Sequence, residues 1–351
     1  AQHSTAQHST AQHSTAQHST AQVVFLCVSL LLVIIISGIR FSDGSMLLAI
    51  ARGATVDNSV FTNSAAQYVW DSPLKIITLQ LLPAKIIIIA LAFGFLGILP
   101  LIGIISKDYH KFWIAFVVVF LTPAFKVSIQ NMGVGDGFVV FLIIIMSLSR
   151  SFFLVAVPLF LIAIWHPQQS FFIGISYLLA RYCYVGELNK KELVTVFGSL
   201  GIAALIFFFY KSTLSFSYSG REVYMASRIN ELLHHNLIYA PIAFAPIIFW
   251  FLLSGVRVKK GTGLLSLWLC GLAFVSLLTT DVTRVMTIIS LPIVTLGANN
   301  ILIDKVVVPP WKFVFGGTLI ALIPPFSWSG FDYFLWKDLI SDFCKWGVHC
   351  W

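Results

Sequence analysis

Long apolar runs recur along nearly the whole chain, and they constrain its fold more than any other feature. A membrane-spanning helix needs about 20 predominantly apolar residues, and it satisfies its own backbone hydrogen bonds in lipid. The sequence therefore predicts an all-α fold, a polytopic transmembrane helix bundle of about 10–11 spans. The expected spans are 23–39, 76–105, 112–129, 138–149, 151–165, 169–185, 194–210, 237–255, 263–280, 285–303 and 312–326.

Two of these runs, 138–149 and 151–165, are short and are separated by Arg150. They are compatible with one bent helix, with two half-spans or with two separate helices. The number of spans depends on this choice.

The composition excludes a soluble globular protein. Hydrophobic residues make up 58% of the chain and charged residues 10%, whereas soluble domains contain about 25% charged residues. Spans and short loops use up the 351 residues, so a separate cytosolic catalytic domain has no room. Any chemistry is expected within the bundle or its longer loops, and no nucleic acid is expected as a partner.

The chain divides into three parts. Residues 1–22 are an AQHST repeat, which is typical of a tag and is set aside despite its histidines. Residues 23–326 form the expected bundle, including two long outer loops at 40–75 and 211–236. Residues 327–351 form an outer tail, in which Cys344 and Cys350 can pair if the compartment is oxidising.

The distribution of basic residues predicts the orientation. With the N-terminus in the cytoplasm, the clusters KDYHK, NKKE and RVKK all fall in short cytoplasmic loops, as the positive-inside rule requires. The opposite face carries the two long loops. Within them, the segments 45–55 and 223–233 have apolar residues at helical spacing, which predicts two surface helices.

Asp43 follows the first span directly, in the sequence Arg40-Phe41-Ser42-Asp43-Gly44. A carboxylate at the outer end of a helix is suited to act as a general base towards an acceptor hydroxyl. The plainer alternative is that Asp43 caps the helix expected to begin near Ser45.

Asp281 and Arg284 are three positions apart at the mouth between two spans, so they are expected to pair on one helix face. An arginine oriented by an aspartate suits phosphate binding, because its planar guanidinium grips two oxygens. The alternative is a cap with a salt bridge that only ends the span.

Other outer residues form a second set of candidates. Asp136 lies in the turn Gly133-Val134-Gly135-Asp136-Gly137 and offers a second carboxylate, although such turns often have no function. Ionisable groups at bilayer depth normally face the bundle interior or a wet cavity. The remaining candidates for binding phosphate or transferring protons are Arg221, Arg228, His234, His235, His166, Lys85 and Lys126. No metal ligands are assigned, and a divalent metal ion is left open as a cofactor.

The candidates collect on one face, and no internal repeat is evident, which favours an enzyme over a transporter. The layout of the chain resembles the GT-C class of membrane glycosyltransferases. The N-terminus lies inside, and the first span is followed by an outer carboxylate, a long outer loop and then many spans. The O-antigen and capsule polymerases resemble this layout too. One departure is that Asp43 is followed by glycine, whereas the class usually has two adjacent acidic residues.

The resemblance implies transfer of a sugar from a polyprenyl-phosphate donor to a glycan or lipid-linked acceptor. Asp43 would then be the base, Asp281 or Asp136 would orient the acceptor, and Arg284, Arg221, Lys85 or Lys126 would bind phosphate. It also implies a bacterial inner (plasma) membrane with a periplasmic active face. The alternative from another class is a transporter or flippase of lipid-linked glycan.

Overall fold

The computed structural model describes residues 35, 44–53, 66–67, 69–81, 123–130, 135–214, 220–254, 256–279, 281–303, 315, 322–323, 326–327 and 330–331. This part is helical apart from a hairpin of two short antiparallel strands, β1 (Phe326–Ser327) and β2 (Gly330–Phe331). The AQHST repeat, the tail cysteines and most of the runs at 23–39, 76–105, 112–129 and 312–326 lie outside the described residues. The number of spans expected from the sequence therefore stays a prediction.

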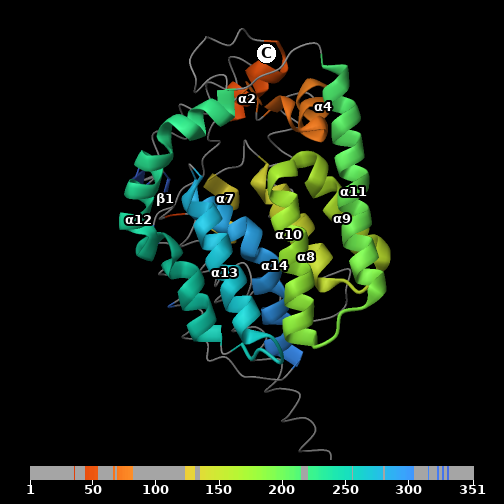
Figure 1. Cartoon of the computed structure of the whole chain (residues 1–351), viewed down its shortest axis with the longest axis vertical. Coiled ribbons are helices and arrows are strands. Elements are labelled where there is room, and N and C mark those ends of the chain that lie inside the picture. Colours follow the sequence, from red (N-terminus) through yellow and green to blue (C-terminus); the bar gives the residue numbers. More distant parts are fainter. Residues whose placement is uncertain are drawn as a thin grey trace, which may run out of the picture.

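Eleven helical elements make up the described part (Figure 1). They are α2 (Gly44–Ala51), α4 (Pro73–Leu81), α7 (Ala124–Gln130), α8 (Asp136–Leu148), α9 (Phe152–Trp165), α10 (Pro167–Ala180), the π-helical turn η2 (Arg181–Val185), α11 (Lys190–Thr213), α12 (Gly220–Ser254), α13 (Thr262–Leu277) and α14 (Val282–Ile303).

The short apolar pair forms two separate helices, so the single bent helix is excluded. The backbone is extended at Ser149 and Ser151, which ends α8 and begins α9. The two helices pack against each other, and the start of α8 lies beside the residue that follows α9. They therefore form an antiparallel hairpin. Each is about 20 Å long, shorter than the roughly 30 Å hydrocarbon core of a bilayer.

Helix α14 lies inside the bundle. It packs against α8, α10, α12 and α13, and 83% of its most apolar stretch, Val282–Asn300, is buried. Its buried hydroxyl groups bond to their own helix: Thr287 donates to the carbonyl of Thr283, and Ser290 to that of Met286. Internal bonding of this kind lets a helix with several hydroxyl side chains pass through an apolar bundle.

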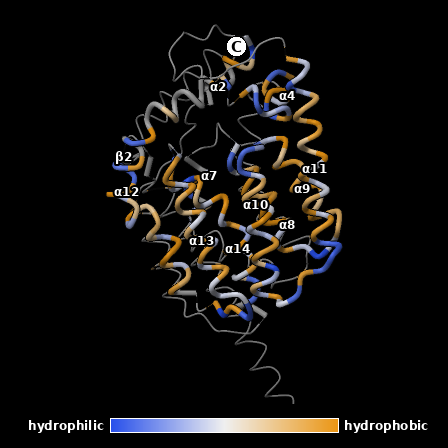
Figure 2. Tube along the Cα trace, viewed as in Figure 1, coloured by the Kyte–Doolittle hydropathy of each residue, from blue (hydrophilic) through white to orange (hydrophobic). Residues whose placement is uncertain are grey.

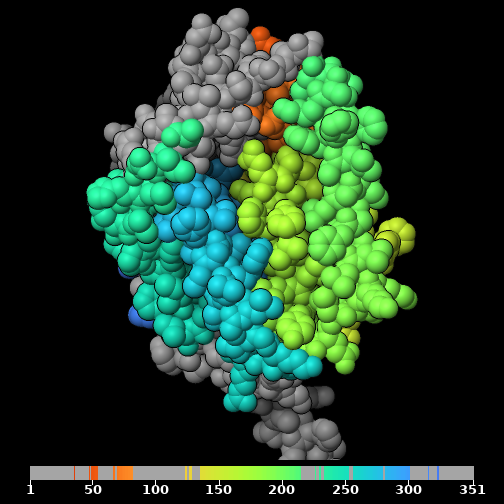
Figure 3. All heavy atoms as spheres, in the orientation of Figure 1, coloured from red at the N-terminus to blue at the C-terminus, as the bar shows by residue number. Residues whose placement is uncertain are grey.

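Helices α11 and α12 lie at the outside, and their apolar side chains point outwards. Only 22% of the apolar stretch in α11 is buried, and 28% of that in α12. Figure 3 shows α12, α13, α10 and α11 next to one another on one face, and Figure 2 shows that most of the residues in these helices are hydrophobic. Three described helices (α11, Leu233–Leu252 within α12, and Val282–Asn300 within α14) are long and apolar enough to cross a membrane. The exposed apolar faces of two of them fit lipid better than water.

One end of the bundle gathers exposed basic residues, and we call it the basic end. Lys190 and Lys191 begin α11, while Lys259 and Lys260 precede α13 and donate their backbone N–H groups to the carbonyl of Cys183 in η2. Arg181 pairs with Glu192 at 2.6 Å. These bonds tie η2, α11 and the loop before α13 together at this end.

The opposite end carries a cap, formed by α2 and α4 (Figure 1). Arg52 donates to the carbonyl of Leu79 at 3.2 Å, and Gln80 donates to that of Ala51 at 3.0 Å. Lys211 at the end of α11 pairs with Asp71, just before α4. Helix α4 also packs on α9. The cap is thus joined to the bundle through both α9 and α11.

Two surface helices were expected in the outer loops, and the second of them is part of a longer helix. The helix expected over 45–55 is present in part as α2, which ends at Ala51 and is followed by a turn at Arg52 and Gly53. The segment 223–233 is instead the beginning of α12, which continues for 35 residues without a break. The expected outer loop 211–236 is therefore mostly helical. Neither Gly nor Pro lies between positions 221 and 240, so nothing in the local sequence ends the helix before the apolar run.

Candidate functional site

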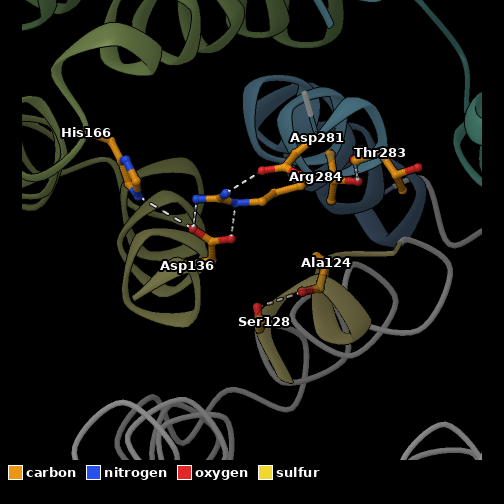
Figure 4. Close-up of polar contacts among 8 residues, drawn as sticks. Ala124, Ser128, Asp136, His166, Asp281, Thr283 and Arg284 are labelled. Carbon is orange, nitrogen blue, oxygen red and sulfur yellow. Dashed lines mark hydrogen bonds and ion pairs between the residues drawn. The ribbon is translucent and has the colours of Figure 1, made fainter. Parts of the chain in front are cut away.

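A cluster of ionisable side chains forms where four helix ends meet, next to the cap (Figure 4). Asp136 is the first residue of α8, and His166 joins the end of α9 to the start of α10. Asp281 and Arg284 lie at the start of α14. We call Asp136, His166, Asp281 and Arg284 the charged cluster. It lies at the opposite end of the bundle from the basic end.

Arg284 is the centre of the charged cluster. Its Nε donates to Oδ2 of Asp136 at 2.5 Å, and its Nη2 donates to Oδ1 of the same carboxylate at 3.1 Å. Its Nη1 donates to Oδ2 of Asp281 at 2.8 Å. The expected pairing of Asp281 with Arg284 is confirmed. The two-bond contact with Asp136 was not expected, because 148 positions separate the two residues.

Burial decreases across the cluster. The side chain of Asp136 is 0% exposed and that of Arg284 13%, whereas that of Asp281 is 40% exposed. Two charge-assisted hydrogen bonds compensate the Asp136 carboxylate for its loss of water. Asp281 is consequently the member of the cluster that a ligand reaches most directly.

His166 lies against the buried carboxylate, with Nε2 3.5 Å from Oδ1 of Asp136. It stands in the turn between α9 and α10, where Pro167 begins the next helix. Burial and then the positive charge of Lys75 lower the pKa of His166 to about 3. The imidazole is therefore neutral at neutral pH, and it can donate one hydrogen bond without adding a charge.

The turn before α8 requires glycine for two reasons. Gly135 has a positive φ of 83°, a conformation that other residues rarely adopt. A Cβ at this position would also lie 2.5 Å from Cζ2 of Trp165. The Trp165 ring fills the space beside the turn, and it makes an edge contact with Phe138 at 5.4 Å between ring centroids. The indole therefore packs against the turn that directly precedes Asp136.

A second cation reaches this region from the cap. Lys75 of α4 is 1% exposed, and its Nζ lies 5.7 Å from the centroid of the Trp165 ring. Its charge also acts on His166. Two carboxylates (Asp136 and Asp281) and the cations Arg284 and Lys75 therefore lie in or near the charged cluster.

The helix ends add to the electrostatics. The N-termini of α8, α10 and α14 converge on the charged cluster, and helix N-termini carry partial positive charge. This explains why both acidic members, Asp136 and Asp281, stand at helix starts. Within the described residues, no three His, Cys, Asp or Glu side chains gather closely enough to hold a metal ion.

The other site residues predicted from the sequence are not seen in the charged cluster. Asp43 and Lys85 lie outside the described residues, and Arg221 and Arg228 belong to α12 but their side chains are not described. Lys126 is buried, and its Nζ donates to the backbone carbonyl of Ile323 at 2.8 Å, so it joins α7 to a distant segment.

His234 is exposed, and the ring of His235 lies 5.3 Å from that of Tyr239. The next residue, Asn236, donates to the carbonyls of Leu277 and Thr279 at the end of α13. Both histidines therefore lie close in sequence to a contact with the α13–α14 turn, which contains Asp281. This part of α12 therefore lies at the end of the bundle that holds the charged cluster.

Sequence reasoning missed two participants, Lys75 and Trp165. Lys75 stands next to an apolar run, which is a signal for a buried charge, and Trp165 ends an apolar run, where tryptophan is typical of the membrane interface. Their role depends on how α4 packs over α9, which no local pattern specifies. No family model, no curated protein and no solved structure matches the chain.

Proposed function

We propose that the chain is a polytopic protein of the bacterial inner (plasma) membrane with about ten or eleven spans. Its N-terminus is cytoplasmic, the basic end faces the cytoplasm and the charged cluster faces the periplasm. Three apolar helices of spanning length and the exposed apolar faces of α11 and α12 support this proposal. The exposed lysines at the basic end agree with the positive-inside rule.

On this membrane, the protein acts as a glycosyltransferase that moves a sugar from a polyprenyl-phosphate donor to a glycan or lipid-linked acceptor. The observation that supports this most is the joining of Asp136, Arg284 and Asp281 at one end of an apolar bundle. A salt bridge that only ends a helix has no need of a fully buried carboxylate. The charged cluster provides carboxylates, a cation and a neutral imidazole beside one another, as the transfer requires.

The reaction is a direct displacement at the anomeric carbon. A carboxylate, Asp43 in this proposal, takes the proton of the acceptor hydroxyl as the new carbon–oxygen bond forms. The bond between the anomeric carbon and the phosphate oxygen breaks, and the polyprenyl phosphate leaves with the electron pair. Asp281 orients the acceptor, and the cations Arg284 and Lys75 stabilise the developing negative charge.

The test is restoration of a surface glycan in a strain lacking this chain. Asp43→Asn, Asp281→Asn and Arg284→Lys are expected to lower glycan synthesis at least about tenfold and to leave the lipid-linked precursor accumulating. Glu192→Gln is the matched control, because Glu192 is also paired with an arginine but lies at the basic end. Full activity of all three site variants would exclude this assignment.

Polymerisation of an O-antigen or capsule is a closely related alternative, because it uses the same donor chemistry. The arrangement of α12 favours it, since this helix brings Arg221 and Arg228 to the same end of the bundle as the charged cluster. Gel separation of the glycan distinguishes the two. A polymerase gives a ladder of repeat lengths that its loss reduces to one unit, whereas a single-sugar transferase changes one band.

A transporter or flippase of lipid-linked glycan is the alternative from another class. The largely buried ion pair between α8 and α14 favours it, because ionisable residues inside a bundle often mark transport pathways. An assay of the purified protein in vesicles distinguishes a transporter from a transferase. Movement of a fluorescent lipid-linked sugar between leaflets, with no new glycosidic bond, would support transport and contradict the transferase.

A further inference from the structure

The basic end concentrates exposed positive charge around η2. Within the described segments 181–192 and 256–261, the exposed charged side chains are five bases and one acid: Lys190, Lys191, Arg257, Lys259, Lys260 and Glu187. Five positive charges and one negative charge give these side chains a formal sum of +4. A surface with this excess of positive charge attracts anions.

Hydrogen bonds bring the lysines of two segments together. Lys259 and Lys260 lie against η2, because their backbone N–H groups both donate to the carbonyl of Cys183, at 2.9 and 3.2 Å. The Nζ of Lys260 also donates to the carbonyl of Gly186 at 3.1 Å, where the loop into α11 begins. Lys190 follows Gly186 by four residues, so this loop spans at most about 14 Å. The lysines that begin α11 therefore lie near those that precede α13.

Exposed apolar side chains border these lysines. Val194 lies one helical turn after Lys190 in α11 and is 69% exposed, and Leu264 in the first turn of α13 is 52% exposed. The ring of Tyr182 packs against Gly261, since a Cβ there would be 2.9 Å from Cε1, and this tyrosine is 37% exposed. Figure 2 shows hydrophilic residues at this end of the bundle and mostly hydrophobic residues along α11 and α13. Lysines next to tyrosine and aliphatic side chains are typical of the membrane interface.

The combination of charge and apolar surface selects the kind of partner. A phospholipid carries its phosphate directly beside its acyl chains, so it can contact the lysines and the apolar side chains together. A nucleic acid or an acidic soluble protein would neutralise the lysines but leave Val194 and Leu264 in water. The cytoplasmic leaflet, which the basic end faces in the proposed orientation, is the leaflet that carries anionic lipid.

We propose that the basic end binds the headgroup of an anionic phospholipid of the cytoplasmic leaflet. Lys190, Lys191, Lys259 and Lys260 surround the phosphate, and Tyr182 lies at the level of the lipid glycerol. This binding depends on the proposed membrane placement of the basic end, but not on the proposed sugar transfer.

The experiment measures binding of fluorescent phosphatidylglycerol to the full chain in an uncharged detergent, with fluorescent phosphatidylcholine as the zwitterionic comparison. Each lysine near an anionic lipid surface strengthens binding about fivefold. The double variants Lys190→Gln with Lys191→Gln, and Lys259→Gln with Lys260→Gln, are therefore each expected to weaken binding of phosphatidylglycerol about 10- to 25-fold. Arginine at all four positions keeps the charge and should bind within about threefold of wild type.

Glu187→Gln is the matched variant of opposite sign. It removes the one exposed acid of the two segments, so it is expected to strengthen binding of phosphatidylglycerol by up to about fivefold. Loss of folding would weaken binding in every variant, whereas only an electrostatic contact gives opposite effects for lysine and glutamate. For wild type alone, raising the salt concentration from about 0.05 to 0.5 M should weaken binding about tenfold, because salt screens exposed charges.

Three results would overturn the proposal while leaving the proposed sugar transfer in place. Wild type could bind phosphatidylcholine as tightly as phosphatidylglycerol, or the double lysine variants could bind phosphatidylglycerol as tightly as wild type. The third result is displacement of the lipid by glycerol 3-phosphate or polyglutamate at equal concentration, which would identify a soluble anion as the partner. A preference for phosphatidylglycerol that the lysine variants lose and Glu187→Gln strengthens would support the proposal.

Discussion

Arg284 and Asp136 are 148 positions apart in the chain, yet their side chains meet through two hydrogen bonds of 2.5 and 3.1 Å. The pair joins the start of α14 to the start of α8. Because Asp136 is fully buried, the arginine is the group that makes its burial tolerable. This contact links the central helix of the bundle to the short α8–α9 hairpin.

Removing the charge of Asp136, the buried partner of Arg284, should destabilise the protein strongly. Asp136→Asn is expected to lower the free energy of unfolding by about 3–5 kcal/mol, because it leaves Arg284 without its two-bond partner. Asp281→Asn should cost only about 1 kcal/mol, since that carboxylate is partly exposed. Thermal unfolding in detergent measures both. Equal losses for the two variants would contradict the central role of Asp136.

The buried pair should also show coupling. Asp136→Leu with Arg284→Met replaces both charges by apolar groups, and its loss should be well below the sum of the two single losses. A double-mutant cycle on the same unfolding assay provides the coupling energy. Additive losses would mean that the two side chains act independently.

Gly135 should tolerate no side chain. Gly135→Ala combines backbone strain at φ 83° with a clash against Trp165, so it is expected to cost more than about 2 kcal/mol. Gly186 is a matched control, because its φ of 92° is similar and a Cβ there meets nothing within 4 Å. Gly186→Ala therefore reports the backbone strain alone, at about 1 kcal/mol. If both alanine variants melt alike, the contact with Trp165 has no energetic weight.

The neutral state of His166 predicts acid sensitivity. Its pKa is lowered to about 3 in the folded chain, so the unfolded chain binds the extra proton first as the pH falls below about 6.5. Stability should therefore be full near pH 7 and fall by about 1.4 kcal/mol for each pH unit between about 6 and 3. The groups that face His166 are Asp136 on α8, Arg284 on α14 and Lys75 on α4.

His166→Gln separates the acid sensitivity caused by His166 from that caused by the carboxylates. Glutamine keeps a donor for Asp136 but cannot titrate, so its melting temperature should depend less on pH than that of wild type in this range. The measurement is melting temperature against pH for both proteins. Parallel curves would show that His166 does not cause the acid sensitivity.

The outward apolar face of α11 should lie in lipid. In a cysteine-free background, Phe197→Cys and Phe208→Cys are expected to resist a water-soluble thiol reagent in vesicles, because both side chains are exposed in the fold yet apolar. Lys191→Cys should react from one side of the membrane only. Rapid labelling at Phe197 or Phe208 would contradict the proposed span.

Local patterns in the sequence were sufficient for the helical class and for several elements. The apolar runs predicted α9, α11, α13 and α14 to within a few residues, because apolar length alone specifies such helices. The three-residue spacing of Asp281 and Arg284 predicted their pairing, since it depends on one helix turn. The continuous α12 was not predicted, because polar residues in its first third resemble a loop while nothing ends the helix.

The composition of the site was decided only by the tertiary structure. Asp136, His166 and Arg284 come from three different helix junctions, and the packing of α8 and α9 beside α14 brings them together. Lys75 joins them because α4 packs on α9. Periodicity along a chain reports which face of a helix is apolar, but it does not report which helix end lies against another. Pairing across long sequence separations therefore depends on packing, and here packing converts scattered polar residues into one charged cluster.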